Sequence, residues 1–310
     1  MAPADWLWIA LLSVIWGGSF IFIELALAGF HPFTLVAIRL GLGAALLIIW
    51  LGMSGRFPRL TRERIIVVAV LGLLNNAIPF SLIAWGQTGL GAGLASIFNA
   101  TTPLFTILVA HLWSTDDKIT ASRLIALLTG LGGVIVLMGG ERLSELGSGI
   151  APQLAMLGAA LSYAIAGVYG RRVARLGLDP AAASAGQFSI AFLMIAPVAL
   201  LIDQPWTLPA PDAAAWASVL ALAVLSTVFG YLIYFKVLAR SGATNTMLVT
   251  FLSPVSAILL AVTFLGERMT LTQLGGMALI FIGLAVADGR IIGWLGGWLA
   301  AKRGGPKLGA

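Results

Sequence analysis

The stretch from Ile65 to Thr115 contains no Asp, Glu, Lys or Arg over 51 positions. At about 1.5 Å per helical residue it is long enough to cross a hydrocarbon core of roughly 30 Å twice. The whole chain has the same character, with 60% hydrophobic and 10% charged residues, whereas soluble domains average roughly 45–50% and 25%. A lipid-exposed backbone must satisfy its own hydrogen bonds. The sequence therefore predicts an all-α membrane protein.

Apolar runs and turn signals divide the chain into ten predicted transmembrane helices. They lie near 6–28, 32–53, 65–86, 92–113, 121–140, 149–171, 180–202, 213–236, 243–265 and 270–289. The connections are short, so no loop is long enough to carry a soluble active site. Trp294 and Trp298, followed by Lys302 and Arg303, predict a cytoplasmic interfacial tail over 293–310 instead of an eleventh span.

The distribution of basic residues predicts the orientation. If the N-terminus lies in the cytoplasm, fifteen Lys and Arg residues fall on the cytoplasmic side and two fall outside. Cytoplasmic loops of membrane proteins carry such an excess. We therefore expect a multi-pass protein of a bacterial inner (plasma) membrane with both termini cytoplasmic. This topology also explains the net charge of +6 without a nucleic-acid partner.

An internal repeat relates the two halves of the chain. At an offset of 151 residues, Pro103 matches Pro254 and Phe80 matches Tyr231, and the pair Gly91-Ala92 matches Gly242-Ala243. The predicted units are a first five-span repeat over 1–145 and a second over 146–292. Because five is odd, the second repeat must start on the opposite side of the membrane. We therefore expect inverted repeats, which suit alternating access.

A polar stripe recurs in the fourth and ninth predicted spans, each time beside a proline. Steps of three and four residues place each stripe on one helix face. A proline in a span leaves a carbonyl without its usual donor, so two matched, interrupted helices predict a site between the halves, with gating at Pro103 and Pro254. The alternative is a pair of kinked packing helices. The stripes are Ala95, Asn99, Thr102 and Thr106, and Thr246, Thr250, Ser253 and Ala257.

Several motifs carry a family likeness. The first half contains Ile15-Trp16-Gly17-Gly18-Ser19-Phe20, with Pro32 and Arg39 downstream; the second contains Tyr231, Tyr234, Leu252-Ser253-Pro254-Val255 and Leu265-Gly266-Glu267-Arg268. In these motifs and in its five-plus-five spans, the chain resembles the drug/metabolite transporter superfamily, EamA type. The resemblance implies a central cavity between spans 1, 3, 4, 6, 8 and 9, and export of small metabolites. Bacterial members of this kind include exporters of aromatic and other amino acids.

Aromatic, amide and hydroxyl residues on these spans form the predicted substrate-binding set. Ring faces with a few polar groups suit a planar or apolar side chain that carries a polar head. Packing alone is the alternative for each aromatic residue. The set comprises Trp16, Phe20, Asn76, Phe80, Phe98, Asn99, Thr102, Tyr163, Thr227, Tyr231, Tyr234, Thr250 and Ser253.

Glu24 and Arg39 are the two charged residues inside predicted spans that a soluble loop cannot explain. A charge at the membrane centre costs about 2.5–3.5 kcal/mol on insertion scales, so each needs a partner or access to water. The functional interpretation makes Glu24 a proton or cation site for coupling and Arg39 a carboxylate anchor. The structural alternatives are an ion pair between the two, or an interfacial position for Glu24.

Other function classes find little support in the sequence. The chain has no cysteine, and its two histidines, His31 and His111, lack acidic neighbours, so we expect no metal site and no cofactor. No glycine-rich stretch has the context of a phosphate-binding loop. Gly130, Gly133, Gly276 and Gly283 predict close helix packing within a monomer, with a dimer as the alternative.

The sequence thus predicts a secondary transporter in the lipid bilayer, which exports amino acids, preferably aromatic or hydrophobic ones, or related metabolites. Efflux of cationic drugs is the alternative within transport. A membrane-embedded enzyme or scaffold is the alternative of another class, although its polar groups would have to cluster at one interface.

Overall fold

The computed structural model describes residues 3–55, 58, 61–113, 120–138, 150–207, 209–246 and 248–288. All regular structure in these ranges is helical. Eight helices are long and apolar enough to cross a membrane, and two shorter apolar helices, Leu124–Val136 and Leu271–Val286, coincide with the predicted fifth and tenth spans. The expectation of an all-helical, multi-pass membrane protein is confirmed. The count of ten spans stays a prediction, and the predicted tail over 293–310 lies outside the described residues.

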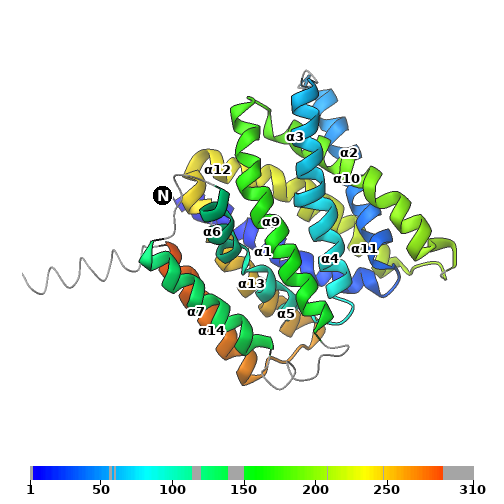
Figure 1. Cartoon of the computed structure of the whole chain (residues 1–310). Helices are drawn as coiled ribbons and strands as arrows, with labels where there is room; N and C mark the ends of the chain where they lie inside the picture. The colour runs from blue at the N-terminus through cyan, green and yellow to red at the C-terminus, as the bar shows by residue number, and fades with distance from the viewer. Residues whose placement is uncertain are drawn as a thin grey trace, which may run out of the picture.

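The described residues of the first half form seven α-helices (Figure 1). They are α1 (Pro3–Leu27), α2 (Pro32–Met53), α3 (Arg62–Gly72), α4 (Ile78–Gly86), α5 (Ala92–Asn99), α6 (Thr102–Trp113) and α7 (Ala121–Met138). The π-helical segment η1 (Leu73–Ala77) joins α3 to α4. Local sequence explains several starts: the Thr61 side chain accepts a hydrogen bond from the Arg64 N–H, and Pro32 occupies the first turn of α2, where its missing N–H costs nothing.

The second half contains α9 (Ala151–Arg175), α10 (Pro180–Val198), α11 (Ala213–Ala221), α12 (Gly230–Thr246), α13 (Leu248–Leu260) and α14 (Leu271–Asp288). Between and after them lie the π-helical segments η2 (Ala199–Asp203), η4 (Leu222–Phe229) and η5 (Ala261–Leu265) and the short η3 (Pro205–Thr207). Asp179 and Asp212 cap the starts of α10 and α11 through their carboxylates. Helix α12 bends sharply at Gly242, whose φ of 76° favours glycine.

Two of the π-helical segments occupy corresponding places in the two halves. Shifted by 151 residues, η1 falls inside η4. Pro79 comes after η1 and has no N–H to donate to the carbonyl of Asn75, so the regular α pattern cannot continue there. A π turn holds one more residue than an α turn and rotates the helix on its N-terminal side relative to the helix on its C-terminal side. This rotation decides which side chains reach the cavity.

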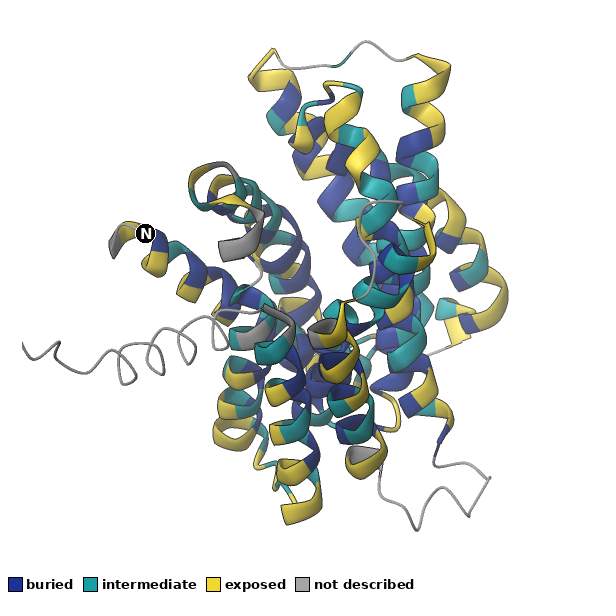
Figure 2. Cartoon of the chain, turned by 60° about the vertical axis from the view of Figure 1, so that its left-hand side comes forward, coloured by how far each residue is buried: buried dark blue, intermediate teal, exposed yellow. Residues whose placement is uncertain are grey.

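Helices from the first predicted half pack against helices from the second. Helix α1 packs against α13 and α12, α2 against α10, and α4 against α9. Large apolar side chains lie exposed along the outer faces of the helices, where a lipid bilayer would cover them (Figure 2).

Helices α7 and α14 form a pair beside the other helices (Figure 1). A methyl group at Gly133 would lie 2.7 Å from the Gly276 carbonyl oxygen, and one at Gly283 would lie 2.7 Å from the Ala126 carbonyl oxygen. Backbone therefore meets backbone at these two positions. The glycines expected to permit close packing do so within the chain.

Candidate functional site: a central cavity

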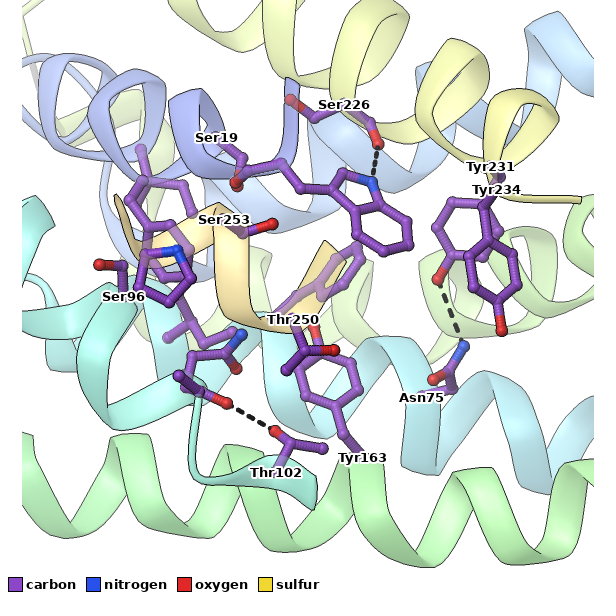
Figure 3. A pocket seen from close by; sticks show the side chains of 18 of the residues that line it. Ser19, Asn75, Ser96, Thr102, Tyr163, Ser226, Tyr231, Tyr234, Thr250 and Ser253 are labelled. Atoms are coloured by element: carbon purple, nitrogen blue, oxygen red, sulfur yellow. Dashed lines mark hydrogen bonds between the residues drawn. The ribbon is translucent and has the colours of Figure 1, made fainter. Parts of the chain in front are cut away.

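A cavity of about 320 Å³ lies between helices of both halves (Figure 3). Its volume falls within the range of about 300–1,000 Å³ that is usual for small-molecule sites. Its wall combines aromatic rings, amides, hydroxyls and one cation. It is lined by Trp16, Ser19, Phe20, Ile23, Arg39, Asn75, Phe80, Ile83, Ser96, Asn99, Ala100, Thr102, Tyr163, Ser226, Tyr231, Tyr234, Thr250, Ser253 and Pro254.

An aromatic cluster forms one side of this cavity. The ring of Trp16 lies 6.2 Å from that of Tyr231 and 5.5 Å from that of Tyr234, measured between centroids. The indole N–H of Trp16 donates to the Ser226 carbonyl oxygen over 3.2 Å, which fixes the plane of the ring (Figure 3). Gly230 provides the space, because a methyl group there would lie 2.6 Å from the indole nitrogen. The cluster offers aromatic ring surfaces to the cavity, and the indole N–H of Trp16 is already bonded.

Arg39 is the one charged residue among the described residues that line the cavity. Its side chain is buried, with 7% exposure. Its Nε donates to Thr227 Oγ1 over 2.9 Å, and its guanidinium carbon lies 4.0 Å above the centre of the Phe80 ring. Neither partner is an anion, and no carboxylate pairs with Arg39 among the described ion pairs. The guanidinium is thus held in place with its charge uncompensated, as an anion-binding group requires.

A small amide cluster borders the aromatic side. Asn75 Nδ2 donates to the Tyr231 hydroxyl over 3.3 Å (Figure 3) and also lies 3.3 Å from Gln187 Oε1. Asn76 Nδ2 also donates to the Tyr231 hydroxyl, over 3.5 Å. The cluster orients Tyr231 and joins η1, α10 and α12 beside the cavity.

The π-helical segments change which residues line the cavity at two predicted positions. Counting back four residues from Phe80 and Tyr231 leads to Asn76 and Thr227, but both are fully buried and neither lines the cavity. Counting back five leads to Asn75 and Ser226, and these do line it. The extra residue of a π turn accounts for the shift in both halves. Thr227 instead serves the site indirectly, through its hydrogen bond with Arg39.

The first polar stripe lies across a break in the helix. Helix α5 ends at Asn99 and α6 begins at Thr102, so Pro103 occupies the first turn of α6, and the chain departs from the α pattern ahead of it. Pro103 itself does not line the cavity. The hydroxyl of Thr102 donates to the Asn99 carbonyl oxygen over 2.7 Å, and that of Thr106 to the Thr102 carbonyl oxygen over 2.9 Å. These hydroxyls satisfy backbone groups near the break.

Asn99 differs from its neighbours on the stripe. Its side-chain Oδ1 is buried, has no hydrogen-bond partner, and belongs to a residue that lines the cavity. Phe98, which the sequence placed in the cavity, is fully buried in the main apolar cluster instead. Consecutive helical residues differ by about 100° in direction, and here Phe98 turns into the apolar cluster while Asn99 borders the cavity.

The second stripe lies on a continuous helix. Pro254 falls inside α13 and, lacking an N–H, cannot donate to the carbonyl of Thr250 one turn earlier. Thr250, Ser253 and Pro254 all line the cavity, and the Ser253 hydroxyl is a second buried oxygen without a partner. The ends of both stripes lie elsewhere: Ala95 and Ala257 are fully buried, and the Thr246 hydroxyl donates to the Gly242 carbonyl oxygen.

Glu24 does not line the cavity, and the ion pair with Arg39 that was one alternative is not formed among the described ion pairs. Its carboxylate accepts a hydrogen bond from the Ala92 N–H over 2.7 Å, at the start of α5. The Glu267 carboxylate accepts from the neighbouring Gly93 N–H over 3.1 Å. Both acids thus bind the positive end of α5. Within the described part of the chain, no group of metal-ligating residues is found.

Sequence reasoning missed several lining residues besides Asn75 and Ser226, among them Ser19, Ile23 and Ser96. Ser19 and Ile23 lie three and seven residues after Trp16, so the helical period could have identified them. Ser96 precedes Asn99 by three residues and falls on the same face of α5. For Asn75 and Ser226 the available signal was a residue that disturbs a helix four positions later, Pro79 or Gly230.

Comparison with protein families adds an independent observation. The model of the EamA-like transporter family matches the chain twice, over residues 6–139 and 151–287. The "Probable amino-acid metabolite efflux pump" of Escherichia coli (strain K12) is 26% identical, and the match covers 92% of this chain and 95% of that protein. The uncharacterized transporter YvbV of Bacillus subtilis (strain 168) is 28% identical over 90% of each chain.

The fold has a counterpart among solved structures. A crystal structure of another protein matches with a TM-score of 0.63 at 20% sequence identity, and the match covers 93% of this chain and 98% of that one. At this level of identity the likeness concerns the fold alone. The family match and the relatives named as transporters indicate a transporter and not an enzyme.

Proposed function

Because the chain belongs to the EamA-like transporter family, we propose that it exports amino acids or related metabolites that carry a carboxylate. The observation that carries this proposal is the uncompensated guanidinium of Arg39 in the central cavity. A carboxylate would replace the solvent that the buried cation lacks and would form charge-assisted hydrogen bonds with it. The name of the Escherichia coli relative supports the same substrate class.

Aromatic and other large apolar side chains are the preferred substrates in this proposal. The ring cluster around Trp16, Tyr231 and Tyr234 offers apolar aromatic surfaces in the same cavity as Arg39. A substrate with a carboxylate at one end and a planar side chain at the other uses both features. Efflux of cationic drugs is disfavoured, because the single charged lining residue in the described structure is itself a cation, and like charges repel.

Transport proceeds by alternating access between inverted repeats in a bacterial inner membrane, with ten spans and both termini in the cytoplasm. Three features support this part of the proposal: the two matches of the family model, the paired π-helical segments, and the bias of basic residues. The break between α5 and α6 and the proline-interrupted α13 are the gating elements, because each can bend beside the cavity. The protein acts as a monomer.

Transport by the purified protein in liposomes tests the proposal. Liposomes are loaded with a panel of radiolabelled amino acids, and efflux is measured with and without a proton gradient. Efflux of phenylalanine, tryptophan or leucine that exceeds that of lysine is the expected result. A gradient that drives this efflux would add proton coupling to the mechanism. Movement of a cationic dye without movement of any amino acid would overturn the proposal.

A further inference from the structure

The cavity contains polar atoms that the carboxylate anchor leaves unused. Asn99 Oδ1 at the end of α5 and Ser253 Oγ in the middle of α13 are both buried, both without a hydrogen-bond partner, and both on residues that line the cavity. A buried polar oxygen without a partner costs about 1–3 kcal/mol. In a folded protein such atoms need an explanation. A ligand that donates hydrogen bonds to them supplies one.

The surrounding backbone adds acceptors and no competing donors. Pro254 has no N–H to offer, so the Thr250 carbonyl lacks the donor that an uninterrupted helix would provide. The nearby Thr102 hydroxyl already donates to the Asn99 carbonyl oxygen (Figure 3). The two buried side-chain oxygens without a partner on this side of the cavity, Asn99 Oδ1 and Ser253 Oγ, can each accept a hydrogen bond. This distinguishes it from the Arg39 side, where the functional group is a donor.

We propose that Asn99 and Ser253, with the Thr250 carbonyl, form a subsite for the ammonium group of the substrate. An ammonium group carries three donors and no acceptor, so a set of neutral oxygens satisfies it without burying a carboxylate. The subsite deepens the proposed function and rests on it: Arg39 binds the carboxylate, and Asn99 and Ser253 bind the ammonium group of the same α-amino acid. The substrate is thereby identified as a zwitterion rather than a simple anion.

The subsite joins the two helices that the repeat relates. Asn99 comes from the interrupted fourth predicted span and Ser253 from the ninth. The offset of 151 relates Asn99 to Thr250, three residues before Ser253, and relates Ser253 to Thr102, three residues after Asn99. A substrate bonded to both holds α5 against α13, which already pack together. A molecule that lacks the ammonium group leaves this contact unmade.

Three probes of nearly equal shape test the inference. L-Phenylalanine carries both charged groups, 3-phenylpropanoate lacks the ammonium group, and 2-phenylethylamine lacks the carboxylate. Binding is measured by thermal shift or scintillation proximity on the purified full chain. We expect the wild-type protein to prefer phenylalanine over 3-phenylpropanoate by about tenfold or more, since a hydrogen bond to a charged group contributes about 1.5–3 kcal/mol.

The variant Asn99→Leu keeps the size of the side chain and removes its oxygen. It should bind 3-phenylpropanoate as the wild type does and lose the preference for phenylalanine, so that the two affinities agree within about threefold. Ser253→Ala removes the other side-chain acceptor and should also lower the preference. Asn99→Asp keeps an acceptor and should preserve the preference. If Asn99→Leu weakens both ligands equally, or leaves their ratio unchanged, the subsite is wrong.

Thr106→Val is the matched control. The Thr106 hydroxyl belongs to the same stripe, but it bonds to the Thr102 carbonyl and does not line the cavity, so the ratio should stay at its wild-type value. The two levels of the proposal fail differently. If the wild type binds no amino acid, the proposed function fails. If it binds phenylalanine and 3-phenylpropanoate equally well, the role of Arg39 in binding the carboxylate is retained and the ammonium subsite is wrong.

Discussion

Arg39 and Glu24 are both charged residues within helices predicted to cross the membrane, and the structure places them in different surroundings. Arg39 lines the cavity and bonds to a neutral hydroxyl and an aromatic face. Glu24 lies outside the cavity, and its carboxylate caps the start of α5 together with Glu267. The carboxylate of Glu24 accepts a hydrogen bond from the backbone, whereas the guanidinium of Arg39 has no anionic partner in the described structure and can bind a ligand. A buried charge therefore indicates function only when its partners are known.

Replacement of Arg39 should have the largest effect on transport. Arg39→Gln keeps a hydrogen-bond donor but removes the charge, and loss of one partner of a buried charge pair costs about 2–5 kcal/mol, or roughly 30- to 4,000-fold in affinity. We expect this loss for every carboxylate-bearing substrate in a liposome assay. The affinity of Arg39→Lys should lie between those of the wild type and Arg39→Gln, because lysine keeps the charge but lacks the planar guanidinium group. Undiminished transport by Arg39→Gln would show that Arg39, like Glu24, does not bind the substrate.

Thr227 should matter because it positions Arg39. Its Oγ1 accepts from Arg39 Nε over 2.9 Å and donates to the Leu222 carbonyl oxygen over 2.9 Å. Thr227→Val keeps the shape and removes both bonds, so we expect affinity for carboxylates to fall by about tenfold, near the lower end of what a hydrogen bond to a charge contributes. Thr227→Ser retains the hydroxyl and serves as the control. Equal affinities for the two variants would contradict the positioning role.

Removal of the Glu24 carboxylate should affect stability more than substrate binding. In Glu24→Leu the Ala92 N–H loses its acceptor, which we expect to lower the free energy of unfolding by about 1–2 kcal/mol. Thermal unfolding in detergent, followed by intrinsic tryptophan fluorescence, measures the change as a fall in Tm. Substrate affinity, measured well below Tm, should stay within about threefold of the wild type. A large loss of affinity at unchanged Tm would place Glu24 in the transport path after all.

Glu24→Gln should have the smallest effect of these variants. The amide oxygen can still accept from the Ala92 N–H, and the side chain does not reach the cavity. We expect the dependence of efflux on external pH to superimpose on that of the wild type. A flattened pH profile in this variant, with expression and Tm unchanged, would make Glu24 a coupling site.

The sequence predicted where the cavity lies better than it predicted which residues line it. The helical period indicated a face within each span, and the family resemblance placed those spans around one cavity, which Trp16, Phe80, Asn99 and Ser253 line. The same period failed wherever a π turn intervened and pointed to Asn76 and Thr227 in place of Asn75 and Ser226. Periodicity assumes a constant number of residues per turn, and one extra residue changes the face of every residue before it in the helix.

The surroundings of the charges were beyond a sequence-based prediction for another reason. Glu267 lies more than two hundred residues after Glu24, yet both bind the start of α5. Thr227 is likewise 188 residues from Arg39. Such partners depend on how α1, α2 and α5 pack against the second half, which hydropathy does not determine. Long apolar runs in the sequence predict the helices, whereas the contacts between helices depend on how their side chains fit together.

The backbone contact between α7 and α14 restricts how this part of the sequence can change over evolution. Gly133 and Gly283 face carbonyl oxygens at distances that exclude a side chain, while Gly132 and Gly275 in the same helices face open space. Mutations at the first two positions push the helices apart, whereas a methyl group at either of the second two meets no neighbouring atom within 4 Å. Among descendants of a common ancestor, the first pair should remain glycine while the second pair drifts freely.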